Sequence, residues 1–159
     1  PSRVFAFTFV GAARSVDGGD TWNFINPGPG VGDIAVDPAN SSVVYAALFD
    51  DISKSVDGGD TWSSTALGQV VNNSFYYYGF GGDSIVVDPL NSDTIYAHGD
   101  GGGTYASRDA GKTWNWLHDN SSGIGGRARV IVAPTVMSFS GRPAVPVNRE
   151  PLLTLRRDW

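Results

Sequence analysis

The 159-residue sequence contains no cysteine, so disulfide frameworks, thiolate metal sites and cysteine nucleophiles are excluded together. It contains one glutamate, Glu150, so a pair of carboxyl groups for general acid and base catalysis would have to come from aspartates. The only histidines, His98 and His118, have no acidic neighbours at a metal-ligand spacing. We therefore expect neither a metal nor a cofactor.

Basic clusters and long apolar runs are also lacking. The formal net charge is −5, and no window gathers more than a few Lys or Arg, which argues against a nucleic-acid partner or an anionic membrane surface. No apolar run is long enough to span a membrane. Three Asn-x-Ser sequons, at Asn40, Asn72 and Asn120, suit an exported chain, so we expect a secreted or extracellular glycoprotein.

What the sequence does contain is typical of β-structure. Glycine (21 residues) and proline (9 residues) separate short runs of Val, Ile, Tyr, Phe and Thr. No segment has the pattern of an amphipathic helix. The composition predicts an all-β fold of many short strands joined by tight turns.

One octapeptide, SVDGGDTW, occurs unchanged at residues 15–22 and 55–62, and a looser copy, SRDAGKTW, occurs at residues 107–114. A second landmark, Val-Asp-Pro, precedes two of these copies, and Tyr45 and Tyr96 each follow its aspartate by eight residues. Phe5 lies ten residues before the first octapeptide, as Tyr45 does before the second. The N-terminal apolar run is therefore predicted to be a strand of the repeat.

Each repeat unit is predicted to form four antiparallel strands, which in the second unit are residues 34–36, 43–48, 52–55 and 61–65. Four short strands in about 40 to 50 residues is the pattern of a propeller blade. We expect a partial β-propeller of about three blades over residues 1–134, and a divergent tail or truncated next blade over residues 135–159. Since three blades do not close a ring, open blade edges are expected to allow self-association.

The repeated carboxylates are predicted to stabilise turns and not to form an active site, because Ser and Asp side chains bond nearby backbone amides and Gly tolerates positive φ. A calcium loop is the alternative, but alternating oxygen ligands and a closing Glu are missing. The proposed turn residues are Ser15, Asp17, Gly19, Thr21 and Trp22; Ser55, Asp57, Gly59, Thr61 and Trp62; and Ser107, Asp109, Gly111, Thr113 and Trp114.

The pattern Ser-x-Asp-x-Gly-x-Thr-Trp resembles the Asp-box, or BNR repeat, of sialidases, xyloglucan-cleaving glycoside hydrolases, sortilin-type receptors and photosystem assembly factors. The resemblance covers residues 1 to about 134. It implies a β-propeller in which the boxes lie on the face away from the ligand.

The opposite face is predicted to carry function, and its longest loop, residues 67–83, is rich in aromatic side chains. Tyr76, Tyr77, Tyr78 and Phe80 are candidate substrate-binding residues, since aromatic rings stack on the C–H faces of sugars. The alternative is that some of these rings begin a strand or pack between blades.

The acidic candidates on this face are Asp33, Asp50, Asp51, Asp83 and Asp100. The segment IYAHGDGGGTYASRD resembles a segment of xyloglucanase-type hydrolases, which implies a catalytic role for Asp100. Asp83 and His98 are further candidate substrate-binding residues. His98 and Gly99 depart from the family pattern, and Gly-Asp-Gly is also common in tight strand connections. In that family the second carboxylate comes from another propeller.

The expected function is therefore that of a carbohydrate-active propeller fragment, which binds or hydrolyses a neutral polysaccharide such as a β-glucan or xyloglucan. The alternative is a non-catalytic, protein-binding or self-assembling propeller segment.

Overall fold

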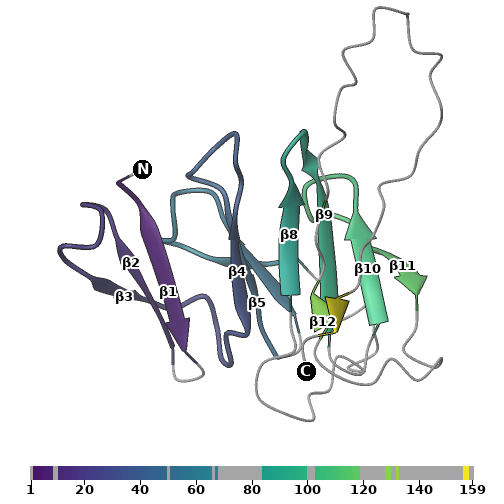
Figure 1. Cartoon of the computed structure of the whole chain (residues 1–159), viewed down its shortest axis with the longest axis horizontal. Coiled ribbons are helices and arrows are strands. Elements are labelled where there is room, and N and C mark those ends of the chain that lie inside the picture. The colour runs from purple at the N-terminus through teal and green to yellow at the C-terminus, as the bar shows by residue number, and fades with distance from the viewer. Residues whose placement is uncertain are drawn as a thin grey trace, which may run out of the picture.

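The computed structural model describes residues 2–8, 11–49, 51–65, 67, 84–99, 103–118, 128–129, 132 and 156–157. In this part of the chain the regular elements are strands, and all of them pair antiparallel. Three sheets of three or four strands stand side by side in chain order (Figure 1). The chain is a partial β-propeller, so the predicted fold class is confirmed.

The first unit is a three-stranded sheet in the order β1-β2-β3, made of β1 (Val4–Thr8), β2 (Gly11–Ser15) and β3 (Asn23–Ile25). Phe5 pairs with Arg14, as the alignment of Phe5 with Tyr45 requires, because Tyr45 pairs with Lys54 in the second unit. These strands are therefore the second, third and fourth strands of a blade. In the described residues β1 is an edge strand.

The second unit contains β4 (Asp33–Val36), β5 (Val44–Ala47), β6 (Ile52–Ser55) and β7 (Ser63–Ser64), in that order across the sheet. The fourth strand is shorter than the predicted residues 61–65. The Thr61 amide donates to the Asp57 carboxylate and so belongs to the preceding turn.

The third unit contains β8 (Ser84–Asp88), β9 (Asn91–Gly99), β10 (Gly103–Ser107) and β11 (Asn115–His118), again in that order across the sheet. The turn between β8 and β9 is tighter than its counterpart between β4 and β5, so that Asp88 pairs directly with Asn91. Carboxylate and amide side chains stabilise both turns: Ala39 N donates to Asp37 Oδ1 and Leu90 N donates to Asp88 Oδ1.

The core lies between neighbouring sheets. Ala12 of the first unit packs with Ala46 and Leu48 of the second, and Ile34 and Trp62 pack against them. A larger cluster joins the second and third units and includes, among others, Tyr45, Ile52, Leu67, Ile85, Val87, Tyr105 and Trp114. Each unit therefore becomes stable by burying its face against the next unit.

The last described strands are β12 (Ala128–Arg129) and β13 (Arg156–Arg157), which pair with each other through two residues each. Val132 packs against Tyr96 and Ala106 of the third unit. In the same way, Ile85 and Val87 of β8 share a buried cluster with Tyr45 of the second unit. The sequence also predicts a strand over residues 128–132, where the repeat begins again, and β12 begins at the first of these residues.

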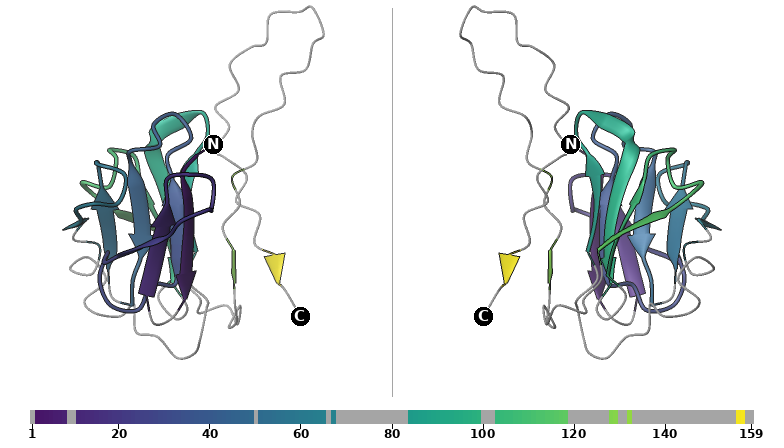
Figure 2. Two further views of the ribbon diagram at one scale, coloured as in Figure 1. Left: turned by 90° about the vertical axis from the view of Figure 1, so that its left-hand side faces the viewer. Right: turned by 90° about the vertical axis from the view of Figure 1, so that its right-hand side faces the viewer.

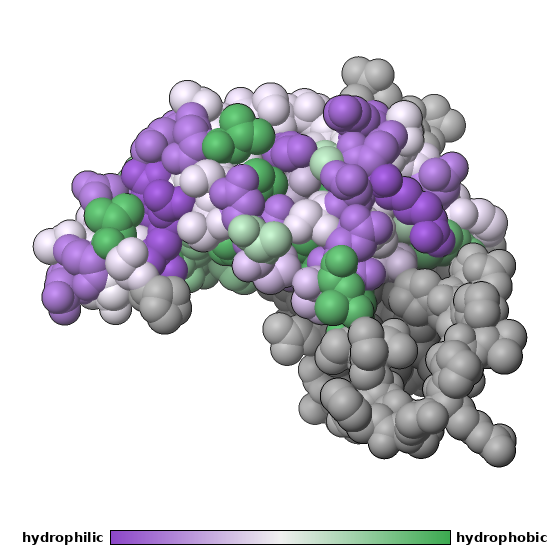
Figure 3. All heavy atoms as spheres, turned by 90° about the horizontal axis from the view of Figure 1, so that it is seen from above, coloured by the Kyte–Doolittle hydropathy of each residue, from purple (hydrophilic) through white to green (hydrophobic). Residues whose placement is uncertain are grey.

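The three units follow an arc. Seen from above, the described residues form an arch with a concave side (Figure 3). The strands of all three sheets lie along about the same axis (Figure 2). The sheet that contains β1 lies at one end of the row, and β12 lies beside the third sheet, at the other end (Figure 1). Within the described residues, no helix has the length and apolar character to cross a membrane.

Candidate functional site

The three octapeptide turns share one network of internal hydrogen bonds. In the second copy, Gly59 N donates to Ser55 Oγ (2.8 Å), and Ser55 Oγ donates to Asp57 Oδ1 (2.7 Å). The Thr61 amide donates to Asp57 Oδ1 (2.9 Å), and the Thr61 hydroxyl donates to Asp57 Oδ2 (2.5 Å). The same four contacts occur in the first and third copies. Both oxygens of each carboxylate are thus engaged within the turn.

These contacts favour the charged form of each aspartate. The hydroxyl and amide of Thr113 and the hydroxyl of Ser107 lower the pKa of Asp109 from 3.8 to about 2. The pKa of Asp17 is lowered well below its usual range by Ser15 and Thr21, and that of Asp57 by Thr61 and Ser55. Aspartates with such low pKa values are poor general acids or bases near neutral pH.

The lowered pKa values predict acid sensitivity. Because each folded-state pKa lies below the unfolded value of 3.8, the three aspartates contribute stability that is fully present above that pH and is lost as pH falls toward 2. We expect the urea midpoint to fall over this interval. In Asp17→Asn the slope should be smaller, whereas Asp20→Asn, which removes the same charge outside the Ser-Asp-Thr network, should keep the parent slope. Equal slopes in all three proteins would contradict this.

The octapeptide turn of each later unit is bonded to the unit before it. Arg14 Nη1 donates to the carbonyl of Gly58 (2.6 Å), and Arg14 Nη2 forms an ion pair with Asp60 (2.6 Å). At the next junction, Lys54 Nζ donates to the carbonyl of Ala110 (2.8 Å). Arg14 and Lys54 each directly precede an octapeptide serine, so the same position makes the same contact twice. The turns therefore hold neighbouring blades together.

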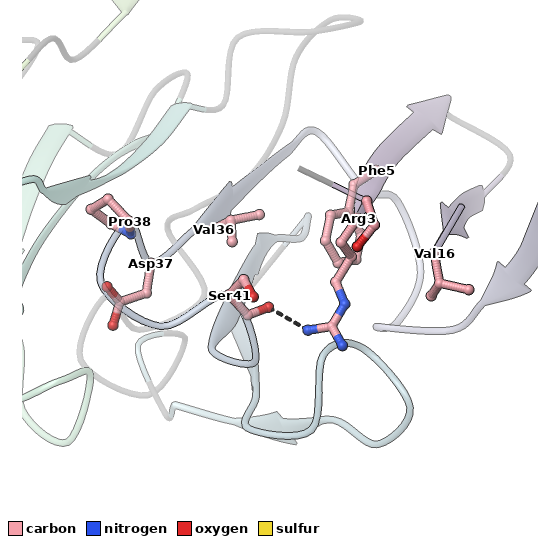
Figure 4. Close-up of a pocket in the computed structure, with 8 residues that line it drawn as sticks. Arg3, Phe5, Val16, Val36, Asp37, Pro38 and Ser41 are labelled. Atoms are coloured by element: carbon pink, nitrogen blue, oxygen red, sulfur yellow. Dashed lines mark hydrogen bonds between the residues drawn. The ribbon is translucent and has the colours of Figure 1, made fainter. Parts of the chain in front are cut away.

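The junction between the first two units contains an open cavity of about 660 Å³ (Figure 4). Phe5 and Val16 line it from the first unit, and Asp37 and Pro38 line it from the second. The Arg3 guanidinium lies inside and donates to the carbonyl of Ser41 (2.7 Å). Because Val16 belongs to an octapeptide and Asp37-Pro38 to the other turn, both kinds of turn lie on one face of the propeller, which we call the turn face. The sequence showed no sign of this cavity.

The opposite face, here called the loop face, carries the connections from β5 to β6 and from β3 to β4. Phe49, 42% exposed, lies over Gly30: a Cβ at Gly30 would be 2.1 Å from the ring. Glycine is therefore required at position 30 for two reasons: the ring of Phe49 leaves no room for a Cβ, and the backbone has φ +67°. Phe49 was not among the site residues predicted from the sequence; its signal was its position between the second and third strands of the second unit.

Two of the acidic candidates on the loop face lie in the described residues. Asp33 Oδ1 accepts from its neighbour Ile34 N, and Asp33 Oδ2 accepts from Ile85 N of β8 (3.0 Å), so this carboxylate links the first strands of two units. The Ser64 hydroxyl donates to Asp51 Oδ2. Both carboxylates therefore have structural contacts.

His98, a predicted substrate contact, lies inside the third unit at 2% exposure. Its Nδ1 is 3.0 Å from Thr104 Oγ1 of the adjacent strand. A buried ring in this position serves packing, so His98 is left out of the sugar-contact surface proposed below. The other site candidates, Tyr76, Tyr77, Tyr78, Phe80, Asp83 and Asp100, lie outside the described residues, as does Asp50.

No cluster of three or more His, Cys, Asp or Glu side chains suited to a metal ion occurs in the described part of the chain.

Solved structures resemble this arrangement. A GH74 enzyme from Niastella koreensis aligns with a TM-score of 0.65 and 25% identity over 88% of this chain. An ancestral GH74 enzyme aligns at 0.62 and 18% identity over 82% of the chain, and the GH74 xyloglucanase from Xanthomonas campestris at 0.52 and 21% over 69%. The chain is thus similar in fold to part of these propeller enzymes.

The similarity covers only a small part of those proteins. The chain spans 23% of the Niastella koreensis enzyme, 18% of the ancestral enzyme and 19% of the Xanthomonas campestris enzyme. No family model matches the sequence, and no curated protein matches it.

Proposed function

We propose that the chain is a segment of a carbohydrate-active Asp-box propeller that binds a neutral polysaccharide such as a β-glucan or xyloglucan. The observation that carries this proposal is the likeness to the Niastella koreensis GH74 enzyme over 88% of the chain at 25% identity. Hydrogen bonding within the three octapeptide turns supports assigning them to the Asp-box repeat.

The polysaccharide surface is proposed to lie on the loop face, around the connection between β7 and β8. This connection contains Tyr76, Tyr77, Tyr78 and Phe80 and leaves the second unit on the same face as Phe49. Aromatic rings in a row suit successive sugar rings, since each ring covers the apolar C–H face of one sugar. Asp83 would add a hydrogen-bonding group for sugar hydroxyls.

Removing the tyrosine rings is expected to weaken polysaccharide binding by tenfold or more. Truncating an aromatic hot-spot residue costs about 2 kcal/mol or more, and about 1.4 kcal/mol is a factor of ten in affinity. The test is calorimetric titration with xyloglucan of the parent chain and of the triple variant Tyr76→Ala, Tyr77→Ala and Tyr78→Ala. Phe24→Ala is the matched control, because Phe24 is a 94% exposed ring on β3, outside the proposed surface.

Equal affinity of the triple variant and the parent would overturn the proposed surface, and no binding by the parent would overturn the function. Because the proposed ligand is neutral, raising the salt concentration from 0.05 to about 0.5 M should leave the affinity almost unchanged.

Asp100 is proposed as the acid or base of a hydrolytic site, on the resemblance of residues 95–109 to xyloglucanase-type hydrolases. Asp100→Asn should then remove any release of reducing ends from xyloglucan while leaving binding intact. The second carboxylate is proposed to come from another propeller, as in that family. The two acids on the loop face that the structure describes, Asp33 and Asp51, have structural contacts.

A secreted location is proposed with this function, supported by the sequons at Asn40, Asn72 and Asn120. Expression in a glycosylating host, followed by a glycosidase-sensitive mass shift of the secreted chain, would test it.

A second candidate function, a self-assembling propeller segment, is favoured by one observation. Within the described residues, β1 is the edge of a three-stranded sheet, whereas the corresponding strand β5 has β4 beside it. An open edge of this kind takes up a further strand.

A further inference from the structure

We propose that Asn40 accepts an asparagine-linked sugar, and that the turn between β4 and β5 presents its side chain for this modification. The inference rests on the secretion proposed above and goes beyond it, because it selects one acceptor on structural grounds. The other two sequons, at Asn72 and Asn120, lie outside the described residues. A comparison of two turns with nearly the same sequence carries the inference.

The second and third units use one kind of turn between their first two strands. Both turns have the sequence Asp-Pro-x-Asn-Ser. Asn40 Oδ1 accepts from Ser42 N (3.1 Å), and in the third unit Asn91 Oδ1 accepts from Asp93 N (3.2 Å). This contact is the Asx turn, in which the side-chain carbonyl is used by the local backbone. In both turns Nδ2 is therefore the part of the side chain that is left for other partners.

The two Nδ2 groups have different surroundings. Asn91 Nδ2 donates to Thr94 Oγ1 (3.1 Å), and Thr94 is buried. The residue at the corresponding position of the second unit is Val43, which has no hydroxyl group. Among the described residues Asn40 Nδ2 has no hydrogen-bond partner, and Asn40 is exposed. The same turn thus holds one side-chain amide and leaves the other accessible to an enzyme.

A second difference between the turns concerns the residue two positions after the asparagine. Sugar transfer to asparagine requires a serine or threonine hydroxyl at that position. Ser42 supplies it in the second unit and is partly exposed, whereas Asp93 stands there in the third unit. The hydroxyl at position 42 and the missing hydroxyl at position 43 therefore both favour modification of Asn40.

The backbone of this turn is held without the two side chains that the transfer would need. Asn40 N donates to the carbonyl of Asp37 (3.2 Å), and Gly58 N donates to the carbonyl of Ser42 (2.7 Å). Ser41, the middle residue of the sequon, accepts from Arg3 through its carbonyl (2.7 Å) (Figure 4). The turn belongs to the turn face, so a sugar at Asn40 would leave the loop face free for polysaccharide.

The transfer needs a sugar activated at C1 as a phosphate ester. A bond forms between Asn40 Nδ2 and C1, and the bond between C1 and the phosphate oxygen breaks. The leaving phosphate takes the electron pair of that bond, and one Nδ2 proton passes to a base of the transferase. The product is a neutral N-linked glycoside, with no net oxidation or reduction.

The first experiment uses the whole chain secreted from a glycosylating host, where the sugar donor is a lipid-linked pyrophosphate. Enzymatic release of the sugar in heavy-oxygen water converts a modified asparagine to a labelled aspartate, which peptide mass spectrometry locates. We expect the label at Asn40. Ser42→Asp, which copies the third unit, should abolish it, whereas Ser42→Thr should retain it.

The second experiment tests the free amide on the purified, folded chain, with UDP-glucose and a soluble asparagine glucosyltransferase. Asp93→Ser gives Asn91 the required hydroxyl but leaves its Nδ2 bonded to Thr94. Glucose transfer to Asn91 should therefore be about two- to tenfold slower in this variant than in the double variant Asp93→Ser, Thr94→Val, the range expected for one hydrogen bond. Asn40 is the internal standard in both variants.

The outcomes separate this inference from the proposed function. A secreted chain without a sugar at Asn40, or a folded chain that receives no glucose there, would overturn the acceptor site. Equal transfer to Asn91 in the single and the double variant would overturn the role of the free amide. Failure of secretion alone contradicts the proposed location, and xyloglucan titration of the same samples reports separately on polysaccharide binding.

Discussion

Trp114→Ala is expected to lower the free energy of unfolding by about 3–5 kcal/mol, the usual cost of removing a large buried aromatic ring. Trp114 is 6% exposed in the cluster that joins the second and third units, where Tyr45 and Ile52 are also buried. Its Nε1 donates to Thr65 Oγ1 (3.2 Å), so the substitution also removes the partner of a buried hydroxyl. Urea unfolding followed by far-UV circular dichroism measures the loss.

The matched control is Trp116→Ala. Trp116 lies two residues further along the chain and is 55% exposed. Since little area is removed from water there, its replacement should cost less than about 1 kcal/mol. Similar losses for the two variants would show that the second and third units are not packed as described.

Substitutions at Gly111 and Ala110 are expected to change stability in opposite directions. Gly111 has φ +86°, and a Cβ there would lie 3.3 Å from Thr65 Cγ2 and 3.5 Å from Tyr45 Cε1. Gly111→Ala therefore combines left-handed backbone strain with crowding at the unit junction, and should cost about 2 kcal/mol.

Ala110 already carries such strain, with φ +59°, at the position where the other two octapeptides have Gly18 and Gly58. Ala110→Gly relieves it, at the cost of a more flexible unfolded chain, and should stabilise the protein by about 0.5–1 kcal/mol. Denaturation midpoints of the two variants against the parent test the pair. A stabilising Gly111→Ala, or a destabilising Ala110→Gly, would contradict the turn geometry.

Most strands were predictable from the sequence because their signals are local and repeated. Tyr45 and Tyr96 follow Val-Asp-Pro at one distance, and both occupy the second strand of a four-stranded sheet. The shortened β7 was missed because Thr61 belongs to the octapeptide turn, where its amide bonds to Asp57. The pairing of β12 with β13 was also missed, because it joins residues 27 or more positions apart without a repeat to mark it.

The candidate site was less predictable for a physical reason. His98 was selected by its position in a family-like segment, but burial depends on which sheet covers it, and it lies at 2% exposure. Phe49 was not singled out, since its place over Gly30 requires two loops that are distant in sequence to meet. Contacts of this kind have no local signature.

The first two octapeptides show most directly what sequence determines alone. They are identical, and their Ser-Asp-Thr hydrogen bonds agree within 0.1 Å, because every donor and acceptor lies within the eight residues. The burial of their tryptophans differs, with Trp22 44% exposed and Trp62 packed against the first two units. Local hydrogen bonding follows the sequence wherever the segment occurs, whereas burial depends on whether another unit lies beside it, and only the tertiary structure decides that.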